Sequence, residues 1–465
     1  MKKNEFVSAV SSLMAWIPTE GQVKAMQCMA DYLSDSHPQG VMLLKGYAGT
    51  GKTTLVSAFV RFFSQVGVET VLLAPTGRAA KVMSHYATHA AYTIHKEIYV
   101  LQKRSGRMQM VLRRNEHRRA VFFVDEASMI DDSGASDSQY GSRRLLNDLF
   151  DYVRSGEQCF LVLIGDNAQL PPVNNDYSAA LDADYLSAAY GEKVYEVELR
   201  QVVRQSQESG VLYHATQIRR LMDENKFGPY HFSQPVFAEV KSLKGYEAFE
   251  MLEDAYSRHD IGNVVCIAKS NKQANILNNT IRSRILYMEN FLDAGDMVVS
   301  VKNNYVWLPD NAVTPFIANG DIMEVMSVRK IEECYGFHFA DVSLRMADYD
   351  MEPIDAKVLL DTLSLEAASL SYADTMRLYE AIECDYQDIP LKKDRQKAIM
   401  NNPYWNAIQI KFAYAQTCHK TQGGQWDKVF LLPWNDEQQM HSSEYYRWLY
   451  TAVTRSSRML YVVQE

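Results

Sequence analysis

The fold of this chain is decided by the stretch Gly46-Tyr47-Ala48-Gly49-Thr50-Gly51-Lys52-Thr53. An apolar run, residues 41–44, precedes it, and a helix-compatible segment, residues 54–60, follows. A strand, a glycine-rich loop and a helix start in this order are typical of a phosphate-binding P-loop, because glycines let backbone N–H groups turn towards a phosphate and the helix N-terminus adds a positive end. We predict that Lys52 reaches the β- and γ-phosphates and that the Thr53 hydroxyl holds Mg²⁺. The alternative, a glycine turn with a surface lysine, does not explain the flanking pattern.

A second apolar run, residues 121–124, ends in Asp125 and Glu126. Such a run predicts a central parallel strand, and its carboxyl end lets Asp125 hold Mg²⁺ through water. Glu126 can orient and deprotonate an attacking water, which favours hydrolysis over phosphate transfer to another substrate. Two solvated carboxylates at a strand end are the alternative reading.

Two more apolar runs, residues 71–74 and 160–164, indicate further strands of the same sheet. The second run continues into residues 165–173, where Gln169 is the candidate for contacting the γ-phosphate and reporting its loss. Strands that alternate with helices predict a parallel sheet with the active site along its carboxyl edge.

Length and composition set limits on the other properties. With 465 residues, 47% of them hydrophobic and 23% charged, the chain is too long for one ordinary core, and we expect two to four domains. No apolar run approaches the roughly 20 residues needed to span a bilayer, and the N-terminus lacks the pattern of a secretion signal. The six cysteines are scattered and form no C-x-x-C pair, which predicts free thiols in a reducing, cytoplasmic compartment.

The net charge of −9 argues superficially against a nucleic-acid partner, but the charge is unevenly distributed. Residues 331–400 carry 15 acidic and 7 basic side chains, so nearly all the excess negative charge lies in this segment. Residues 96–120, in contrast, are strongly basic. A polyanion can therefore bind in a local groove despite the acidic total.

These motifs, with others along the chain, resemble those of superfamily 1 helicases. Residues 46–53, 74–80, 93–96, 125–128 and 165–172 resemble motifs I, Ia, Ib, II and III, and residues 199–205, 415–424 and 450–455 resemble motifs IV, V and VI. Residues 19–22 resemble the Q motif, whose glutamine reads adenine. The resemblance covers essentially the whole chain. It implies ATP and Mg²⁺ as cofactors, with an ATP site formed by Gln22, Gly46, Ala48, Gly49, Thr50, Gly51, Lys52, Thr53 and Thr54.

Within the superfamily, the chain resembles the RecD/Dda-like branch of superfamily 1B DNA helicases, from a bacterium or a phage. The amino-acid sequences of residues 165–169 and 419–423 support this assignment to the branch. The short segment 97–120 supports it too, because UvrD/Rep-type relatives carry large helical insertions there. β-like runs at residues 297–301 and 321–325 are compatible with the SH3-like barrel of this branch. The later segment, residues 359–398, is predicted to be helical, and its role is left open.

The resemblance implies an α/β fold with two RecA-like P-loop NTPase lobes, a short 1B hairpin insertion, and an SH3-like barrel with a helical extension in the second lobe. The expected domains are lobe 1A (residues 1–96 and 121–198), the 1B pin (97–120), lobe 2A (199–290 and 407–465) and domain 2B (291–406). Arg204 and Arg455 match the motif IV and VI arginines that reach the γ-phosphate when the lobes close. Ordinary surface ion pairing is the alternative for both arginines.

The resemblance also implies a track for single-stranded DNA across both lobes. Thr76, His95, Thr417 and His419 are expected near its backbone, where hydroxyl and imidazole groups bond phosphates without reading sequence. The two histidines could instead be capped loop residues. A hairpin around residues 103–107, with Arg104 and Arg107, is expected to be the pin that splits the duplex, against the alternative of a solvated hairpin without a role.

The leading hypothesis is an ATP-dependent helicase that translocates 5′→3′ on single-stranded DNA, binds single-strand/duplex junctions and unwinds duplex. Two alternatives remain: a motor subunit of a RecD-type recombination or repair nuclease, and an ATP-driven translocase that displaces proteins without strong unwinding. RNA stays possible as a substrate, because backbone contacts and stacking discriminate weakly. We expect a monomeric motor with no membrane association, which could work with replication or recombination proteins.

Overall fold

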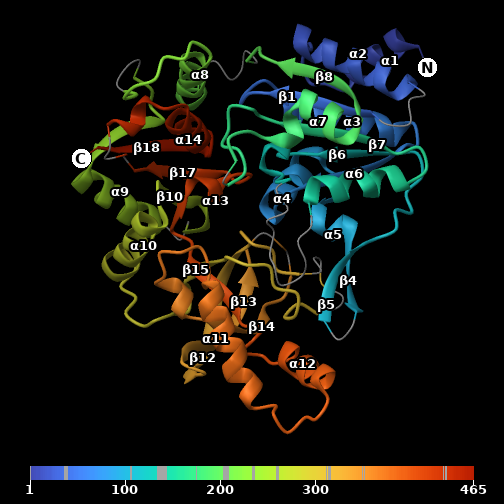
Figure 1. Cartoon of the computed structure of the whole chain (residues 1–465). Coiled ribbons are helices and arrows are strands. Elements are labelled where there is room, and N and C mark those ends of the chain that lie inside the picture. The colour runs from blue at the N-terminus through green and yellow to red at the C-terminus, as the bar shows by residue number, and fades with distance from the viewer. Residues whose placement is uncertain are drawn as a thin grey trace.

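The structure is a computed structural model that contains two parallel sheets, with a hairpin inserted in the first and a β-barrel inserted in the second (Figure 1). It describes residues 2–35, 40–104, 107–132, 144–173, 175–202, 209–232, 236–257, 261–309, 312, 316–347, 349, 351–432, 434 and 437–464. No helix within these residues is long and apolar enough to cross a membrane.

The first lobe is built on a six-stranded, all-parallel sheet of order β3-β2-β6-β7-β1-β8. Its strands are β1 (Gly40–Gly46), β2 (Glu69–Ala74), β3 (Ala91–Thr93), β6 (Ala120–Val124), β7 (Phe160–Gly165) and β8 (Lys193–Leu199). Alternate residues of the strands are buried on opposite faces, since Met42 and Leu44 pack in one core and Val41 and Leu43 in another. The strands predicted from apolar runs are thus confirmed.

Helices cover both faces of this sheet (Figure 1). On one face lie α1 (Lys3–Ser12), α2 (Glu20–Ser34), α3 (Lys52–Gln65) and α4 (Gly77–Ala87). On the other face lie α5 (Ile94–Ile98), α6 (Leu145–Ser155) and α7 (Ala183–Tyr190). Because every strand carries apolar residues on both sides, the sheet needs this double cover to bury them.

The second lobe contains a five-stranded parallel sheet of order β16-β10-β17-β18-β9. Its strands are β9 (Val240–Lys244), β10 (Val264–Ala268), β16 (Ala415–Thr417), β17 (Trp426–Leu431) and β18 (Ser456–Gln464). The associated helices are α8 (Gly210–Asp223), α9 (Gly245–Ser257), α10 (Asn271–Thr280), α13 (Cys418–Thr421) and α14 (Ser443–Val453). Figure 1 shows this lobe beside the first, with α14 and β18 coloured red.

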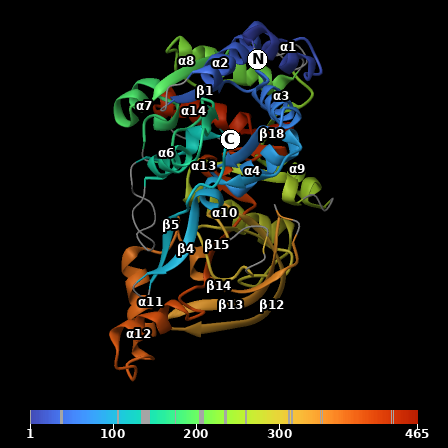
Figure 2. The same ribbon diagram turned by 90° about the vertical axis from the view of Figure 1, so that its right-hand side faces the viewer.

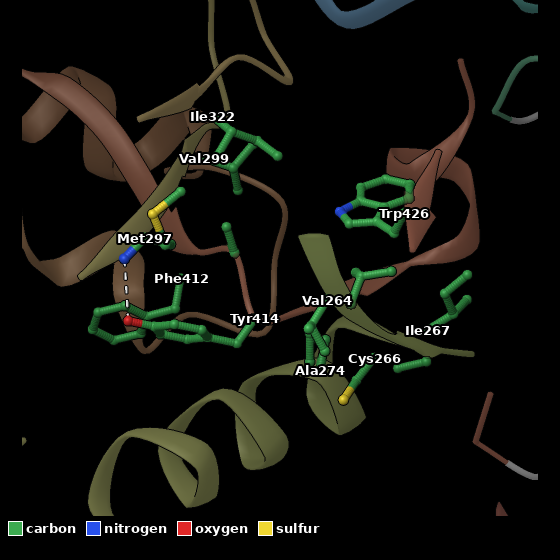
Figure 3. Close-up of a cluster of buried hydrophobic side chains, with 14 of the residues drawn as sticks. Val264, Cys266, Ile267, Ala274, Met297, Val299, Ile322, Phe412, Tyr414 and Trp426 are labelled. Atoms are coloured by element: carbon green, nitrogen blue, oxygen red, sulfur yellow. Dashed lines mark hydrogen bonds between the residues drawn. The ribbon is translucent and has the colours of Figure 1, made fainter. Parts of the chain in front are cut away.

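Five strands between β10 and β16 close into a barrel. They are β11 (Met297–Ser300), β12 (Ile322–Cys334), β13 (Phe337–Met346), β14 (Ile354–Leu359) and β15 (Ile408–Phe412). The barrel shares a core with the second sheet, and Figure 3 shows Met297 and Phe412 on the barrel side and Cys266 on the sheet side. Tyr414 joins the two parts, because its hydroxyl accepts a hydrogen bond from the Met297 N–H at 3.1 Å.

The helical extension begins later than the sequence predicted. Residue 359 ends strand β14, and the helices are α11 (Tyr372–Cys384) and α12 (Lys392–Met400). They bury Leu378, Ile382 and Ile399 against Phe337 and Phe339 of the barrel. The prediction of helix for residues 359–371 was wrong outside the short 3-10 helix Asp361–Leu363, since Leu359 ends β14 and Leu360 and Leu363 pack in the barrel core.

The hairpin of β4 (Tyr99–Arg104) and β5 (Arg107–Leu112) projects from the first lobe, as predicted. It points towards the helical extension, and β5 lies beside α12 (Figures 1 and 2). The fold class expected from the sequence is therefore confirmed in its lobes, hairpin, barrel and helices.

Candidate active site

The P-loop connects β1 to α3 and has the backbone that its glycines permit. Gly49 and Gly51 have φ values of 75° and 81°, which side chains of other residues rarely tolerate. The Thr50 hydroxyl closes the loop by donating to the Tyr47 carbonyl at 2.7 Å. Lys52 Nζ is folded onto the loop and donates to the carbonyls of Gly46 and Tyr47. A cation held only by carbonyl groups is available to a phosphate that enters the loop.

The two acidic residues after β6 lie beside this loop. Glu126 has a φ of 51°, and such left-handed backbone in a glutamate marks a locally constrained turn. Burial raises the pKa of the Glu126 carboxyl above 4.5, and the charge of Asp125 adds to this, while Arg455 and Lys52 oppose it. A carboxylate with a raised pKa next to two cations is suited to accept a proton.

The predicted catalytic residues that the structure describes line one cleft of about 670 Å³ between the two lobes. The first lobe contributes Ala48, Gly49, Gly51, Lys52, Thr53, Thr54, Asp125, Glu126 and Gln169, and the second lobe contributes Thr454 and Arg455. Parallel strands of both sheets bring these residues together, because the loops after such strands collect at one sheet edge.

Gln169 lies in the loop after β7, at the side of the cleft. The side chain is buried, and its Oε1 atom has no hydrogen-bond partner among the described residues. Asp166, in the same loop, accepts from the Ala168 N–H at 2.9 Å, and burial raises the pKa of its carboxyl. An unpartnered, buried amide oxygen at this position fits a role in accepting a hydrogen bond from the attacking water.

Arg455 enters the cleft from the turn between α14 and β18. Its guanidinium is buried and donates to the carbonyls of Thr451 at 3.0 Å and Gly424 at 3.2 Å. These bonds fix the direction of the side chain and use no carboxylate, so the positive charge of the group is not neutralised by them. An arginine held in this way is preorganised for an anionic ligand.

Among the described residues, three that were predicted for the ATP site do not join the cleft lining: Gly46, Thr50 and Gln22. Gln22 is buried, where its Oε1 accepts from the Thr19 N–H at 2.9 Å and its Nε2 donates to the Thr50 carbonyl at 3.4 Å. The glutamine thus supports the P-loop from behind in this structure. Arg204 lies outside the described residues, and its role stays a prediction.

The residues predicted to contact DNA lie on three elements. Thr76 caps α4 by accepting from the Ala79 N–H at 3.2 Å, and Thr417 and His419 lie at the start of α13. His95 packs against Phe316 of the barrel, with ring centroids 6.1 Å apart. Burial lowers the pKa of His95 to about 4 and also lowers that of His419, so both imidazoles are neutral at physiological pH. Neutral histidines can donate a hydrogen bond to a phosphate but add no charge.

Arg104 and Arg107 lie opposite each other in the strand register at the tip of the hairpin. The placement of their side chains lies outside the described residues.

Gly423, in the segment that resembles motif V, approaches Thr76 closely, because a Cβ added there would lie 3.3 Å from Thr76 Oγ1. Parts of both lobes therefore meet at the predicted DNA track.

Several cleft residues were missed by the sequence reasoning, among them Trp16 and Tyr86, and so was Arg219, which lies against the P-loop. Trp16 follows α1, and Tyr86 lies in α4; both line the cleft. Arg219 in α8 holds its guanidinium 4.2 Å from the ring centroid of Tyr47 in the P-loop. Trp16, three residues before the Q-motif-like segment, could have been noticed as an aromatic residue near the predicted adenine site. Tyr86 and Arg219 carry no local signal.

The fold and the cleft define a P-loop protein with two RecA-like lobes. A family model described as an AAA domain matches residues 19–231, and one described as a UvrD-like helicase C-terminal domain matches residues 412–463.

Several proteins are similar to the chain in sequence. The ATP-dependent DNA helicase Dda of Enterobacteria phage T4 is 25% identical over 60% of this chain and 60% of its own length. The ATP-dependent RecD2 DNA helicase of Deinococcus radiodurans is 27% identical over 43% of this chain and 24% of its own length. An uncharacterised protein of Methanocaldococcus jannaschii is 22% identical over 97% of this chain and 39% of its own length. The chain thus spans between about a quarter and three fifths of the length of these relatives.

Among solved structures, Pif1 helicase from Bacteroides in complex with ADP-AlF3 and single-stranded DNA is 15% identical, with a TM-score of 0.46 and coverage of 97% of this chain and 93% of that chain. Pif1 helicase from Candida albicans is 14% identical, with a TM-score of 0.43 and coverage of 97% and 95%. The family-model and sequence matches confirm the resemblance drawn from the motifs: the chain is similar to superfamily 1B helicases of the RecD/Dda-like branch.

The residues of the cleft fit a magnesium nucleotide. In the part of the chain that the structure describes, no group of three or more histidine, cysteine, aspartate or glutamate side chains could hold a metal ion. Mg²⁺ bound with a nucleotide does not need such a group, because phosphate oxygens and water supply most of its ligands. Thr53 and Asp125 both line the cleft and carry oxygen donors of the required kind.

Proposed function

We propose that the chain is an ATP-dependent DNA helicase that translocates 5′→3′ on single-stranded DNA and unwinds duplex. The observation that carries the proposal is the convergence of Lys52, Asp125 and Glu126 of one lobe with Arg455 of the other in a single cleft. Hydrolysis in such a cleft can open and close the lobes, because the arginine contacts the γ-phosphate only while the phosphate is present.

In the proposed reaction, the P-loop N–H groups and Lys52 hold the β- and γ-phosphates. Thr53 and Asp125 hold Mg²⁺, which neutralises phosphate charge when it is bound. Glu126 accepts a proton from the attacking water, and its raised pKa suits this step near neutral pH. Arg455 stabilises the charge that develops on the transferred phosphoryl group.

Gln169, and Arg204 from the segment that resembles motif IV, complete the proposed phosphate contacts. The buried and unpartnered Oε1 of Gln169 supports a contact with the attacking water, whose O–H can donate to it. To hydrogen-bond adenine, Gln22 would have to break its hydrogen bond to the Thr50 carbonyl. If it keeps this bond, its contribution is to hold the P-loop in place.

The proposed domains follow the division expected from the sequence: lobe 1A, the 1B pin at residues 97–120, lobe 2A and domain 2B at residues 291–406. The DNA track would pass Thr76, His95, Thr417 and His419, with the pin at the junction. The meeting of Gly423 and Thr76 supports a track that both lobes contact. The basic hairpin supports a role for Arg104 and Arg107 at the fork.

Two other functions use the same cleft. A motor subunit of a recombination or repair nuclease would hydrolyse ATP and translocate within a larger assembly. A protein-displacing translocase would move along single strands with little unwinding. Neither is favoured by a separate observation, and a monomeric motor, alone or with replication or recombination proteins, is the simpler proposal.

Unwinding by the purified chain tests the proposal. Duplexes with a 5′ tail, a 3′ tail or no tail are incubated with ATP and Mg²⁺, and strand separation is followed by fluorescence. We expect unwinding of the 5′-tailed duplex alone. The matched control is Lys52→Ala, which should abolish hydrolysis and unwinding while leaving the fold intact. Translocation without unwinding would favour the protein-displacing function, and efficient unwinding from 3′ tails would refute the proposed polarity.

A further inference from the structure

Helix α4 ends at the carboxylate that the proposed mechanism assigns to Mg²⁺. The hydroxyl of Tyr86, in the last turn of α4, donates a hydrogen bond to Asp125 Oδ2 over 2.6 Å. The other oxygen, Oδ1, accepts from the Glu126 N–H at 2.8 Å. The direction of the Asp125 carboxylate therefore depends on the position of α4.

The first turn of the same helix is attached to the second lobe. Arg78 Nη2 donates to the Gln425 carbonyl at 3.1 Å, and its guanidinium lies 3.8 Å from the centroid of a Trp426 ring. Gly423 packs against Ala79, because a Cβ added to Gly423 would lie 2.9 Å from Ala79 Cβ. A movement of the second lobe therefore acts directly on this end of α4.

The barrel contacts the same end of the helix. A Cβ added to Gly77 would lie 2.1 Å from the Tyr349 hydroxyl and 2.7 Å from Asp321 Oδ1, so the barrel and α4 touch without a gap. One turn further along, Lys81 Nζ donates to the Ala347 carbonyl at 3.1 Å. The N-terminal end of α4, where Thr76 is expected to contact DNA, is thus held between the barrel and the second lobe.

Helix α4 has eleven residues and is about 16 Å long. Because its backbone hydrogen bonds make it stiff along the axis, a displacement of its N-terminal end by the second lobe or the barrel also moves its C-terminal end. We propose that Tyr86 is a positioning residue that couples DNA, the second lobe and the barrel at one end of α4 to the Mg²⁺-binding carboxylate of Asp125 at the other. The proposal rests on the proposed function and extends it to the regulation of the nucleotide site. DNA that enters the track changes the contacts of Thr76 and Gly77, α4 shifts, and Asp125 is redirected through the Tyr86 hydroxyl. The DNA track and the nucleotide site then both influence the position of α4, and coupling between distant sites requires a shared element of this kind.

Tyr86→Phe removes the hydroxyl and keeps the ring, so it isolates this hydrogen bond. The probe is a fluorescent ADP analogue, whose dissociation constant is measured with Mg²⁺ and with EDTA, each with and without an oligothymidylate. The ratio of the two constants gives the gain in affinity that Mg²⁺ provides. In the wild-type chain we expect DNA to change this gain. In Tyr86→Phe the gain should fall about tenfold, as expected from the loss of one hydrogen bond to a charged group, and DNA should no longer change it. Affinity in EDTA should be unaffected.

Two further variants separate positioning from general damage. His85→Ala alters the neighbouring exposed side chain of α4, and it should behave as wild type in every measurement. Arg78→Ala detaches the opposite end of the helix, so it should reduce the response to DNA while preserving the Mg²⁺ gain measured without DNA. Far-ultraviolet circular dichroism and thermal unfolding verify the fold of each variant.

The results distinguish failure of this inference from failure of the proposed function. If wild type binds the nucleotide and responds to DNA, but Tyr86→Phe keeps both the Mg²⁺ gain and the DNA response, the positioning role is overturned. Equal losses in Tyr86→Phe and His85→Ala would overturn it as well, because they would indicate a general effect on α4. If wild type binds the nucleotide but DNA leaves the Mg²⁺ gain unchanged, the coupling is overturned while the proposed function stands. If wild type binds no nucleotide, the proposed function fails and the inference fails with it.

Discussion

The backbone N–H of Ala48 in the P-loop donates a hydrogen bond to the hydroxyl of Tyr450 in the second lobe, over 2.8 Å. The same hydroxyl donates to Asp166 Oδ2 at 2.6 Å, in the loop that carries Gln169. A neighbouring pair strengthens the connection, since the Leu170 N–H donates to Thr451 Oγ1 at 2.9 Å. Helix α14 therefore contacts two phosphate-site loops of the first lobe through side-chain hydroxyl groups.

Tyr450→Phe tests this connection. The change leaves the Ala48 N–H and the Asp166 carboxylate without their shared partner at a buried position. Hydrogen bonds to charged groups contribute about 1.5–3 kcal/mol, so we expect kcat/KM for ATP to fall about 10- to 100-fold. Steady-state hydrolysis is measured beside the control Tyr446→Phe, whose hydroxyl donates to the Gly228 carbonyl at 3.2 Å, away from the P-loop. Equal losses in both variants would mean that α14 matters for folding and not for the connection between the lobes.

The raised pKa of Glu126 predicts a pH dependence of hydrolysis. A base must be deprotonated, so activity is present above its pKa and is lost as the pH falls through it. Because kcat/KM reports the free enzyme, its acidic limb should lie above the ordinary glutamate value of 4.5. Arg455 lowers the pKa of Glu126, so Arg455→Ala should move this limb to higher pH and also slow turnover by about 10³–10⁵. Arg455→Lys keeps the charge, and its limb should stay near that of wild type.

Glu126→Gln provides the companion measurement, because the amide keeps the shape of the side chain but cannot accept a proton. It should retain ATP binding and lose hydrolysis. An acidic limb that is the same in Arg455→Ala and wild type would show that another group controls it.

Trp16 supplies a prediction about the base of the nucleotide. The indole lines the cleft and is 46% exposed, which leaves a large aromatic surface available for stacking. Stacking of a base on an aromatic side chain contributes about 1–3 kcal/mol, so Trp16→Ala should raise KM for ATP about tenfold or more, with little change in kcat. Trp16→Phe should show a smaller effect. KM for CTP should change less, because a pyrimidine offers a smaller stacking surface.

Fluorescence gives an independent measurement. ATP should quench the emission of wild type, and the quenching should be absent in Trp16→Phe. The control Trp307→Phe removes an indole that donates to the Asn406 carbonyl in the barrel region, and it should leave the quenching unchanged. If KM for ATP and for CTP rise equally in Trp16→Ala, the side chain does not stack on the base.

The predicted site residues that the structure brings into one cleft are those whose chemical type and flanking sequence pattern point to the same place in the fold. Asp125 and Glu126 directly follow the apolar strand β6, and Lys52 follows β1 after the short P-loop, so their place at the sheet edge depends mainly on the strand order. Tyr86 could not be found in this way, because its contact with Asp125 arises from the path of α4 across the sheet. The orientation of Gln22 was equally hidden, since a capping glutamine and an adenine-reading glutamine have the same sequence pattern.

The error at residues 359–371 has a different cause. An apolar run that closes a barrel and one that begins a helix are alike over a few residues. The start of α11 was readable from Ser371, whose Oγ accepts from the Asp374 N–H at 3.0 Å and caps the helix. Attention to capping residues, ahead of hydrophobicity, would have placed the boundary correctly.

The hairpin β4–β5 gives the prediction that separates the motor from strand separation. Replacing residues 103–107 with an Asn-Gly turn shortens the hairpin at its tip and leaves the cleft residues unchanged. Because Asn-Gly favours a tight hairpin turn, the remaining strands should still pair. We expect DNA-stimulated ATP hydrolysis and translocation to persist in this variant, while unwinding of a 5′-tailed duplex falls at least tenfold. Translocation is measured from the fluorescence change that occurs when the protein reaches a fluorophore at the end of a single strand.

A second variant separates the length of the hairpin from its charge. Replacing Lys103, Arg104 and Arg107 with glutamine keeps the length of the hairpin and removes three positive charges. If the pin acts as a physical wedge, this variant should unwind nearly as well as wild type at moderate salt. If instead phosphate contacts dominate, it should lose unwinding and show a weaker dependence of DNA affinity on salt, because each lost contact reduces counterion release. A parallel loss of ATP hydrolysis in the shortened variant would place the hairpin in the DNA track or in the structure of the first lobe and contradict its role as a pin.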